Sequence, residues 1–198
     1  MEYGPRIRFI LFSIAAVLLL VLSAWGIVSI AHRVFRSNKT IATQSQKINL
    51  DEYARGGTNT RITVSGPIVA DEKFVSYQID ISANKRELKT FRGYERKIVD
   101  DKIYTNNSVA YSDFLKALTR LNFTTKLKDR GEDEHGYCAT GSRYTYELYD
   151  VDEQILRSWS VSCGNTIGSY GGPGPATRAL FKTQIPDYTK TIEVVGLE

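Results

Sequence analysis

Residue types that carry enzymatic chemistry are scarce in this sequence. Its 198 residues include two histidines and two cysteines, and they contain no Gly-x-Ser-x-Gly element of the kind that presents a serine nucleophile. Because His32 adjoins an apolar N-terminal run, His135 is left as the base that such a nucleophile would need. No lysine follows the glycine-rich stretch 164–175 in the position of a P-loop. We therefore expect a protein without enzymatic activity and without a cofactor.

An excess of positive charge is absent from most of the chain. The formal net charge is +4, but four of the 26 Lys and Arg residues and one of the 22 Asp and Glu residues lie in residues 1–36. Residues 37–198 therefore hold 22 basic and 21 acidic side chains. Nucleic-acid binding needs a basic surface, so this balance argues against a nucleic-acid partner.

A long apolar run is present at the N-terminus. Residues 9–31 are 23 consecutive residues without a charged side chain, and as a helix they would span about 34 Å, enough to cross a bilayer. Small residues at Ser29 and Ala31 leave a cleaved signal peptide as the alternative, although signal-peptide cores are shorter, about 7 to 15 residues. We expect residues 1–36 to be a transmembrane signal anchor with its flanks, in contact with membrane lipid through residues 9–31.

Composition and periodicity divide the rest of the chain. Residues 37–60 are polar and predict a stalk, residues 61–190 predict an extracytoplasmic α+β domain, and residues 191–198 predict a C-terminal tail. The expected elements are strands at 61–64, 74–81, 88–91, 97–104, 137–149 and 154–162, a long helix from Ser108 capped by Asn107 or Ser108, and a short helix at 176–184. The fold class is therefore α+β: an N-terminal transmembrane helix, then a mainly antiparallel sheet with one long and one short helix.

The two cysteines flank a predicted β-hairpin. If Asp150 and Val151 form its two-residue turn, Cys138 faces Cys163 across the strands. The same register sorts the side chains by polarity, which supports it. The predicted apolar face, on which the long helix would pack, carries Tyr144, Tyr146, Leu148, Ile155, Trp159 and Val161.

The expected Cys138–Cys163 disulfide decides the predicted orientation of the chain. Closing this loop would stabilise the domain by roughly 3 to 4 kcal/mol in the chain-entropy model. Two buried free thiols are the alternative, and they would be typical of a cytosolic protein. Positive residues flank both ends of the apolar run, so they do not fix the orientation. An oxidised pair predicts an extracytoplasmic C-terminal domain and a cytoplasmic amino terminus.

Tyrosines and the glycine-rich stretch are candidates for contacts with a partner. Tyrosine supplies contact area at low entropic cost, and loops that lead into helices can bind anions through backbone amides. For the glycine-rich stretch, a mobile surface loop is the simpler interpretation. The candidate binding surface comprises Tyr137, Tyr149, Tyr170, Asn165 and Ser169.

Charged residues supply two further candidate sites. A basic patch could meet an anionic polymer or lipid headgroups, although a solvated strand-and-turn face is the simpler interpretation. It comprises Lys85, Arg86, Lys89, Arg92, Arg96 and Lys97. An acidic loop with His135, Glu132 and Glu134 has the ligand types for a divalent cation. Because the loop lacks the spacing of a calcium motif, we expect no metal there.

The C-terminal third of the sequence resembles a family of small proteins. The resemblance rests on residues 136–141, Trp159, Ser162-Cys163-Gly164, Gly168-Ser169 and a short helix that ends at 184–187. These features resemble small single-pass membrane-anchored extracytoplasmic proteins of an uncharacterised bacterial family. The resemblance implies a place in the cell envelope and no particular activity.

These observations favour a membrane-anchored extracytoplasmic binding or structural module of the cell envelope, with an envelope protein or polymer as its partner. One alternative is a membrane-tethered hydrolase that acts on an envelope polymer. Another is an accessory subunit of a membrane complex. A deep polar cleft that gathers His135, acidic side chains and the glycine-rich stretch would favour the hydrolase, whereas a flat tyrosine-rich surface would favour binding.

Overall fold

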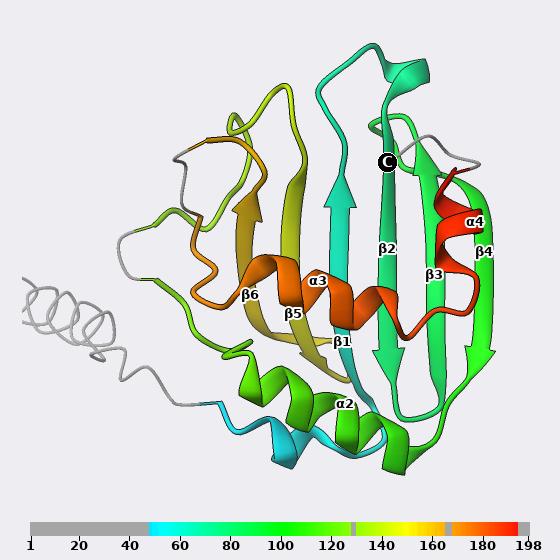
Figure 1. Cartoon of the computed structure of the whole chain (residues 1–198), viewed down its shortest axis with the longest axis vertical. Coiled ribbons are helices and arrows are strands. Elements are labelled where there is room, and N and C mark those ends of the chain that lie inside the picture. Colours follow the sequence, from blue (N-terminus) through cyan, green and yellow to red (C-terminus); the bar gives the residue numbers. More distant parts are fainter. Residues whose placement is uncertain (1–47, 128–129, 165–167, 194–198) are drawn as a thin grey trace, which may run out of the picture. The chain divides into compact units, whose positions relative to one another are not determined.

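A six-stranded sheet with helices on one face makes up the folded domain (Figure 1). The computed structural model describes residues 48–127, 130–164 and 168–193. The expected α+β class with an antiparallel sheet is confirmed within these residues. No helix among them is long and apolar enough to cross a membrane, and the predicted anchor over residues 9–31 lies outside them.

The sheet has the strand order β4-β3-β2-β1-β5-β6, and each strand is antiparallel to its neighbours. The strands are β1 (Thr58–Ser65), β2 (Val75–Ser82), β3 (Lys85–Arg92), β4 (Lys97–Thr105), β5 (Arg143–Asp150) and β6 (Glu153–Val161). The first four form a meander. The chain then returns to place β5 beside β1, so that β1 lies between β2 and β5.

The two faces of the sheet differ in chemistry because side chains alternate along each strand. On the helix side, Ile62 in β1 is paired with Ile79 in β2 and with Tyr146 in β5, and all three are buried in one apolar core. The preceding residue of β1, Arg61, projects to the opposite face, as do its partners Asp80 and Glu147. We call this opposite side, which carries the odd-numbered residues of β1, the polar face.

Helix α2 (Ser108–Arg120) is the long helix that the sequence predicts. Asn107 caps it, since its side-chain oxygen accepts a hydrogen bond from the Ala110 amide at 2.9 Å. Asn122 ends it in the left-handed region, with a φ of 52°, and the following Phe123 amide bonds back to the Leu118 carbonyl at 3.1 Å. The buried residues of α2 recur at helical spacing and comprise Tyr111, Phe114, Leu115 and Leu118.

Two helices complete the layer that covers the apolar face. Helix α3 (Gly174–Lys182) crosses in front of the central strands, and α4 (Tyr188–Glu193) lies over the β3 and β4 side (Figure 1). Phe181 of α3 meets Phe114 of α2 edge to face, with ring centroids 5.1 Å apart. Helix α4 was not predicted, and it extends to Glu193 into the expected tail at 191–198, with Ile192 fully buried. Its six residues are too few to give a periodic signal.

The domain starts earlier in the chain than its periodicity predicts. Leu50–Tyr53 forms a 3-10 helix, η1, which Asn49 caps and which packs against α2. Leu50 is buried in the core, and β1 begins at Thr58. The last part of the predicted stalk at 37–60, from Ile48 onward, therefore belongs to the folded domain. The few apolar residues here, Ile48, Leu50, Tyr53 and Ala54, are irregularly spaced among polar ones, so they form no periodic pattern from which this could be inferred.

The predicted disulfide is present, but the predicted hairpin register is wrong. Val151 and Asp152 form the turn, and a bulge between Leu148 and Tyr149 shifts the pairing again, so that Tyr146 faces Ser158. The register error arose because β5 begins at Arg143, so that Cys138 lies in a loop and its bond to Cys163 says nothing about strand pairing. The correction moves two residues of the predicted apolar face, Trp159 and Val161, to the polar face.

The glycine-rich stretch is closely packed where the structure describes it, so a mobile surface loop is the wrong interpretation of residues 168–172. A Cβ on Gly168 would lie 2.1 Å from the Trp159 carbonyl oxygen, and a Cβ on Gly172 would lie 2.4 Å from the Tyr170 hydroxyl. The Tyr170 amide donates to the Trp159 carbonyl at 2.9 Å, which fastens this stretch to the outer edge of β6. The glycines allow close approach between backbones.

We predict that alkali destabilises the domain through its buried tyrosines. Burial raises the pKa of Tyr170 to about 12, and burial also raises the pKa values of Tyr77, Tyr111 and Tyr146. In the unfolded chain these groups lose their protons near pH 10, so the unfolded state binds fewer protons above that pH. Stability is therefore unchanged below about pH 10 and falls above it, by roughly 1 kcal/mol per such tyrosine at pH 11.

Urea unfolding at pH 8 and pH 11, with tyrosinate absorbance recorded in parallel, measures this loss. The variant Tyr170→Phe should show a smaller difference between the two pH values than the parent chain, whatever its stability at pH 8. An equal difference in both proteins would contradict the assignment to Tyr170.

Candidate functional site

Strand pairing brings five charged residues into one row across the polar face. Each is the direct cross-strand partner of the next, from β3 to β6. In order, the row contains Glu87, Asp80, Arg61, Glu147 and Arg157. Its three carboxylate residues are buried although none of the described helices covers them. The burial of charged groups requires compensation by partners, and each carboxylate has them.

The Arg61–Asp80 pair forms the centre of the row. Arg61 Nε donates to Asp80 Oδ1 at 2.7 Å, and Asn59 Nδ2 donates to the same oxygen at 2.7 Å. The Gln78 side-chain amide donates to the other oxygen of Asp80. Burial by itself lowers the pKa of Arg61, but the charge and hydrogen bond of Asp80 outweigh it, and the pKa of Arg61 is raised. The guanidinium is thereby fixed as a cation on the central strand.

The carboxylates on either side have their own partners. The Glu87 carboxylate forms ion pairs with Lys85 Nζ at 3.0 Å and with Lys89 Nζ at 2.8 Å. Burial raises the pKa of Glu87, but the hydrogen bonds and charges of the two lysines outweigh it and lower the pKa overall. Glu147 accepts hydrogen bonds from the Tyr149 hydroxyl at 3.0 Å and from Gln154 Nε2 at 2.7 Å. The row is thus satisfied within the protein and forms a rigid polar surface.

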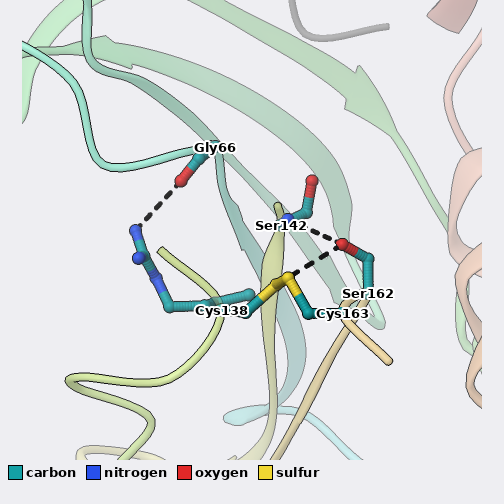
Figure 2. The surroundings of a disulfide bond; sticks show 6 residues. Gly66, Cys138, Ser142, Ser162 and Cys163 are labelled. Atoms are coloured by element: carbon teal, nitrogen blue, oxygen red, sulfur yellow. Dashed lines mark hydrogen bonds between the residues drawn. A yellow bond between two sulfur atoms is a disulfide. The ribbon is translucent and has the colours of Figure 1, made fainter. Parts of the chain in front are cut away.

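The disulfide fastens the loop before β5 to the end of β6 (Figure 2). Its Cα atoms lie 5.4 Å apart. Ser162 Oγ lies beside the disulfide and accepts a hydrogen bond from the Ser142 amide at 2.8 Å (Figure 2). Gly141 fits between these groups only because it lacks a side chain, since a Cβ there would lie 2.5 Å from Ser162 Oγ. A disulfide fits a domain that lies in an oxidising, extracytoplasmic environment.

A second connection joins this loop to the β1–β2 connection. The Ile68 amide donates to the Ala139 carbonyl at 2.8 Å, and Arg143 Nη2 donates to the Gly66 carbonyl at 3.0 Å (Figure 2). Tyr94, from the β3–β4 turn, bonds through its hydroxyl to both the amide and the carbonyl of Val69. Three chain segments are therefore held together at one end of the polar face.

These segments enclose a groove of about 280 Å³, which we call the loop groove. Its lining comprises Ser65, Ile68, Phe74, Ser76, Tyr94, Arg96, Glu134, His135, Gly136 and Arg143. It therefore combines two guanidinium groups and two serines with the stacked rings of Phe74 and Tyr94, whose centroids lie 4.2 Å apart. A second groove, of about 430 Å³, lies beside β4 and is lined by Asp71, Glu72, Arg92, Gly93, Glu95, Lys97, Ile98 and Val99. Its charged residues include both signs, and no unpaired buried polar atom lines it.

The candidate metal ligands lie at the rim of the loop groove, and their charges are already paired. The ligand atoms of Asp133, Glu134 and His135 lie within 4.8 Å of one another. However, Asp133 contacts the His135 ring and Glu134 forms an ion pair with Arg157. Glu132, which the sequence also suggests, lies 2.6 Å from Lys126 instead. Internal ion pairs therefore account for this acidic loop.

The predicted binding surface is not assembled as one patch. Tyr170 and Ser169 are buried: Tyr170 stacks on Tyr146, with ring centroids 3.9 Å apart, and Ser169 Oγ accepts a hydrogen bond from the Trp159 amide. Asn165 lies outside the described residues. Tyr149 lies on the polar face beneath Arg61, and Tyr137 is exposed in the disulfide-bonded loop, where it covers Trp159. Of the candidates, Tyr137 and Tyr149 remain accessible to a partner.

The predicted basic patch is also divided. Lys85 and Lys89 lie on the polar face and pair with Glu87, whereas Arg86 lies on the helix side and donates to the Gln184 and Thr105 carbonyls. Arg92 and Lys97 line the groove beside β4. Arg96 lies over the Phe91 ring, 4.2 Å from its centroid, and reaches the loop groove. A shared basic surface for an anionic polymer is therefore not formed.

Sequence reasoning missed both the charged row and the loop groove. Arg143 and Ser76 carry no motif, and they meet because β1 pairs with β2 on one side and with β5 on the other. The acidic residues in the middle of β2, β3 and β5 are the one available signal, since a charged side chain that neighbouring strands bury requires a partner. Without the strand order, those partners could not be named.

The chain was compared with protein-family models and with curated proteins. No family model and no curated protein matches it.

We predict that removal of the Asp80 carboxylate strongly destabilises the domain. Asp80→Ala leaves Arg61 half-buried without its ion-pair partner, and such a loss costs about 3 kcal/mol. The matched control is Asp100→Ala, which breaks the exposed pair with Lys102 at 3.6 Å and should cost less than about 0.5 kcal/mol. Urea unfolding followed by circular dichroism measures both. Equal losses in the two variants would show that the charged row does not stabilise the sheet.

Proposed function

We propose that this chain is a membrane-anchored binding module that presents the polar face of its sheet on the oxidising side of a membrane. The observation that carries the proposal is the polar face itself, with its internally paired charged row and the loop groove at its disulfide-bonded end. A rigid surface of this kind loses little conformational entropy when a ligand binds. The apolar run at residues 9–31 supports the anchor, and the disulfide supports the location.

A non-catalytic role has support from the described residues. Both cysteines are joined in the disulfide, which removes them as nucleophiles. Among the hydrogen bonds of residues 48–127, 130–164 and 168–193, none joins a serine hydroxyl to a histidine ring, so a nucleophile with a hydrogen-bonded base is not formed there. The described residues of the glycine-rich stretch, 164 and 168–175, do not line the loop groove, although His135 and Glu134 do.

The first experiment tests the location of the domain and its attachment. Whole cells that express the full chain are treated with a membrane-impermeant maleimide, with and without reductant, and labelling is read by mass. We expect no labelling without reductant and labelling of both Cys138 and Cys163 with it, because the disulfide would lie outside the cytoplasm. We also expect the chain to remain in the membrane fraction after an alkaline wash.

Two outcomes would count against the proposal. Thiols that label only after lysis would place the domain in the cytoplasm. Release of the intact chain by the alkaline wash would show that the chain is not anchored in the membrane. The double variant Cys138→Ser with Cys163→Ser is the control for labelling elsewhere and should give no signal in any condition.

A membrane-tethered hydrolase is the second candidate function, and one observation favours it. His135 contacts Asp133 and lines the loop groove together with Ser65 and Ser76, so that an imidazole, a carboxylate and two hydroxyls share one region. We expect the full chain and the variant His135→Ala to release the same amount of soluble material from purified cell-wall polymer, at the level of a blank. Release by the full chain that His135→Ala abolishes would favour the hydrolase instead.

A further inference from the structure

Two arginines of the loop groove have hydrogen-bonding capacity to spare. Arg96 Nη2 donates to Gln78 Oε1 at 3.0 Å, and Arg143 Nη2 donates to the Gly66 carbonyl at 3.0 Å. Both acceptors are neutral, and neither arginine forms an ion pair with a carboxylate of the described residues. A guanidinium carries five N–H donors in a planar fork. Each of these two groups can therefore donate further hydrogen bonds toward the groove.

A buried hydroxyl between them lacks a partner. Ser76 is 2% exposed, and its Oγ forms no hydrogen bond with any described residue. It lies on β2, on the polar face, and contributes to the lining of the groove. An unpaired buried hydroxyl costs free energy that a ligand acceptor would recover. Its position therefore points to a ligand with an acceptor atom at the floor of the groove.

The lining of the groove has an uncompensated positive charge. Besides the two arginines its ionisable side chains are Glu134, His135 and Tyr94. Glu134 is already paired with Arg157, and His135 is turned to Asp133. Burial is the main cause that lowers the pKa of Arg96; the charge of Arg61 lowers it further, and the more distant Glu147 and Asp80 offset this only in part. An anionic group that accepts hydrogen bonds from Arg96 in the groove would stabilise its charged form.

The walls favour a ligand with an apolar or ring-shaped body. The stacked Phe74 and Tyr94 rings form one side, and Ile68 stands beside them with about half of its surface exposed. Tyr94 is fixed by its two hydrogen bonds to Val69, so its exposed ring is a rigid contact surface. The volume of about 280 Å³ limits the occupant to a small molecule or to one residue of a polymer.

We propose that the loop groove binds the carboxylate group of a small ligand, with Arg96 and Arg143 donating hydrogen bonds to its oxygens, Ser76 adding a third donor, and the Phe74–Tyr94 stack contacting the rest of the ligand. A planar carboxylate matches the guanidinium fork, and the ring wall of Phe74 and Tyr94 favours a ligand with an apolar body beside its anionic group, which inorganic phosphate lacks. The proposal deepens the binding function proposed above and rests on it. A sugar acid and the carboxylate of an acylated amino acid share this chemistry.

The test uses the full chain in a neutral detergent and ligand-observed NMR titration with two carboxylates, D-glucuronate and N-acetylalanine. D-glucose and inorganic phosphate are the comparison compounds. We expect saturable binding of at least one carboxylate, no binding of glucose, and weaker binding of phosphate. The carboxylate that binds more tightly identifies the source of the group.

Four variants connect this binding to the groove. Arg96→Gln and Arg143→Gln should each raise the Kd for the bound carboxylate about tenfold, which corresponds to about 1.4 kcal/mol. Arg120→Gln, which removes the same charge from the exposed end of α2, should leave the Kd unchanged. Ser76→Ala should weaken binding while the melting temperature stays the same or rises, because the hydroxyl has no partner in the free protein. A purely structural serine would show the opposite combination.

Each remaining outcome overturns the proposal. Binding of phosphate alone, binding of glucose as tight as that of glucuronate, or absence of binding by both carboxylates would exclude the carboxylate class. Equal effects of Arg120→Gln and Arg143→Gln would mean that only net charge attracts the ligand. These titrations do not depend on where the domain lies. Their failure would overturn the carboxylate site and leave the proposed membrane location intact, because the labelling experiment tests that location separately.

Discussion

The helices that the structure describes cover one face of the sheet, and none of them forms a second layer on the other face. An antiparallel sheet can have one face solvated, but its central strands still exclude water from side chains near their middle. Asp80, Glu87 and Glu147 lie at such positions and are buried by their neighbours. Each charge must therefore find its partner on the same face. Asp80 pairs with Arg61 across the strands, Glu87 pairs with Lys85 and Lys89 of its own strand, and Glu147 accepts hydrogen bonds from Tyr149 and Gln154. The Arg61–Asp80 pair makes the pairing of β1 with β2 chemically specific.

The loop groove follows from where this pairing stops. Toward the disulfide end of the same strands, the residues that face outward are Ser65, Ser76 and Arg143, and no carboxylate faces Arg143 across the sheet. Arg96 lies in the β3–β4 turn, where its φ is 56°, and its guanidinium lies over the Phe91 ring. The charged row and the groove are thus two parts of one surface. One part is saturated by internal ion pairs, and the other has donors in excess.

Local sequence patterns predicted the elements well and their assembly poorly. Tyr111, Leu115 and Leu118 recur at helical spacing and identify α2, and of the two caps that the sequence offers, Asn107 and Ser108, the structure uses Asn107. The position of β5 beside β1 depends on pairing between residues far apart in the chain, for which one sequence carries no signal.

In the β5–β6 hairpin, the predicted disulfide is correct and the predicted strand register is wrong. The Cys138–Cys163 bond was predicted and is present, yet the register from which it was predicted, with a turn at Asp150 and Val151, put Trp159 on the wrong face. A bulge at Leu148 and a loop between Cys138 and Arg143 uncouple the disulfide from the strand register. The groove residue Arg96 shows the same limit of local patterns. The sequence places it in the basic patch, whereas burial and strand order separate it from Lys85 and Arg86.

The redox environment and the geometry of the groove are connected through one loop. Gly136 lines the groove two residues before Cys138, and Arg143 lines it five residues after, so the disulfide lies between two parts of the lining. Ala139, next to Cys138, accepts the hydrogen bond that holds the β1–β2 connection in place at Ile68. The disulfide lowers the entropy of the unfolded chain, and in the folded protein it also limits how far these walls can separate. A groove that depends on this bond keeps its shape where the bond is stable, which is an oxidising environment.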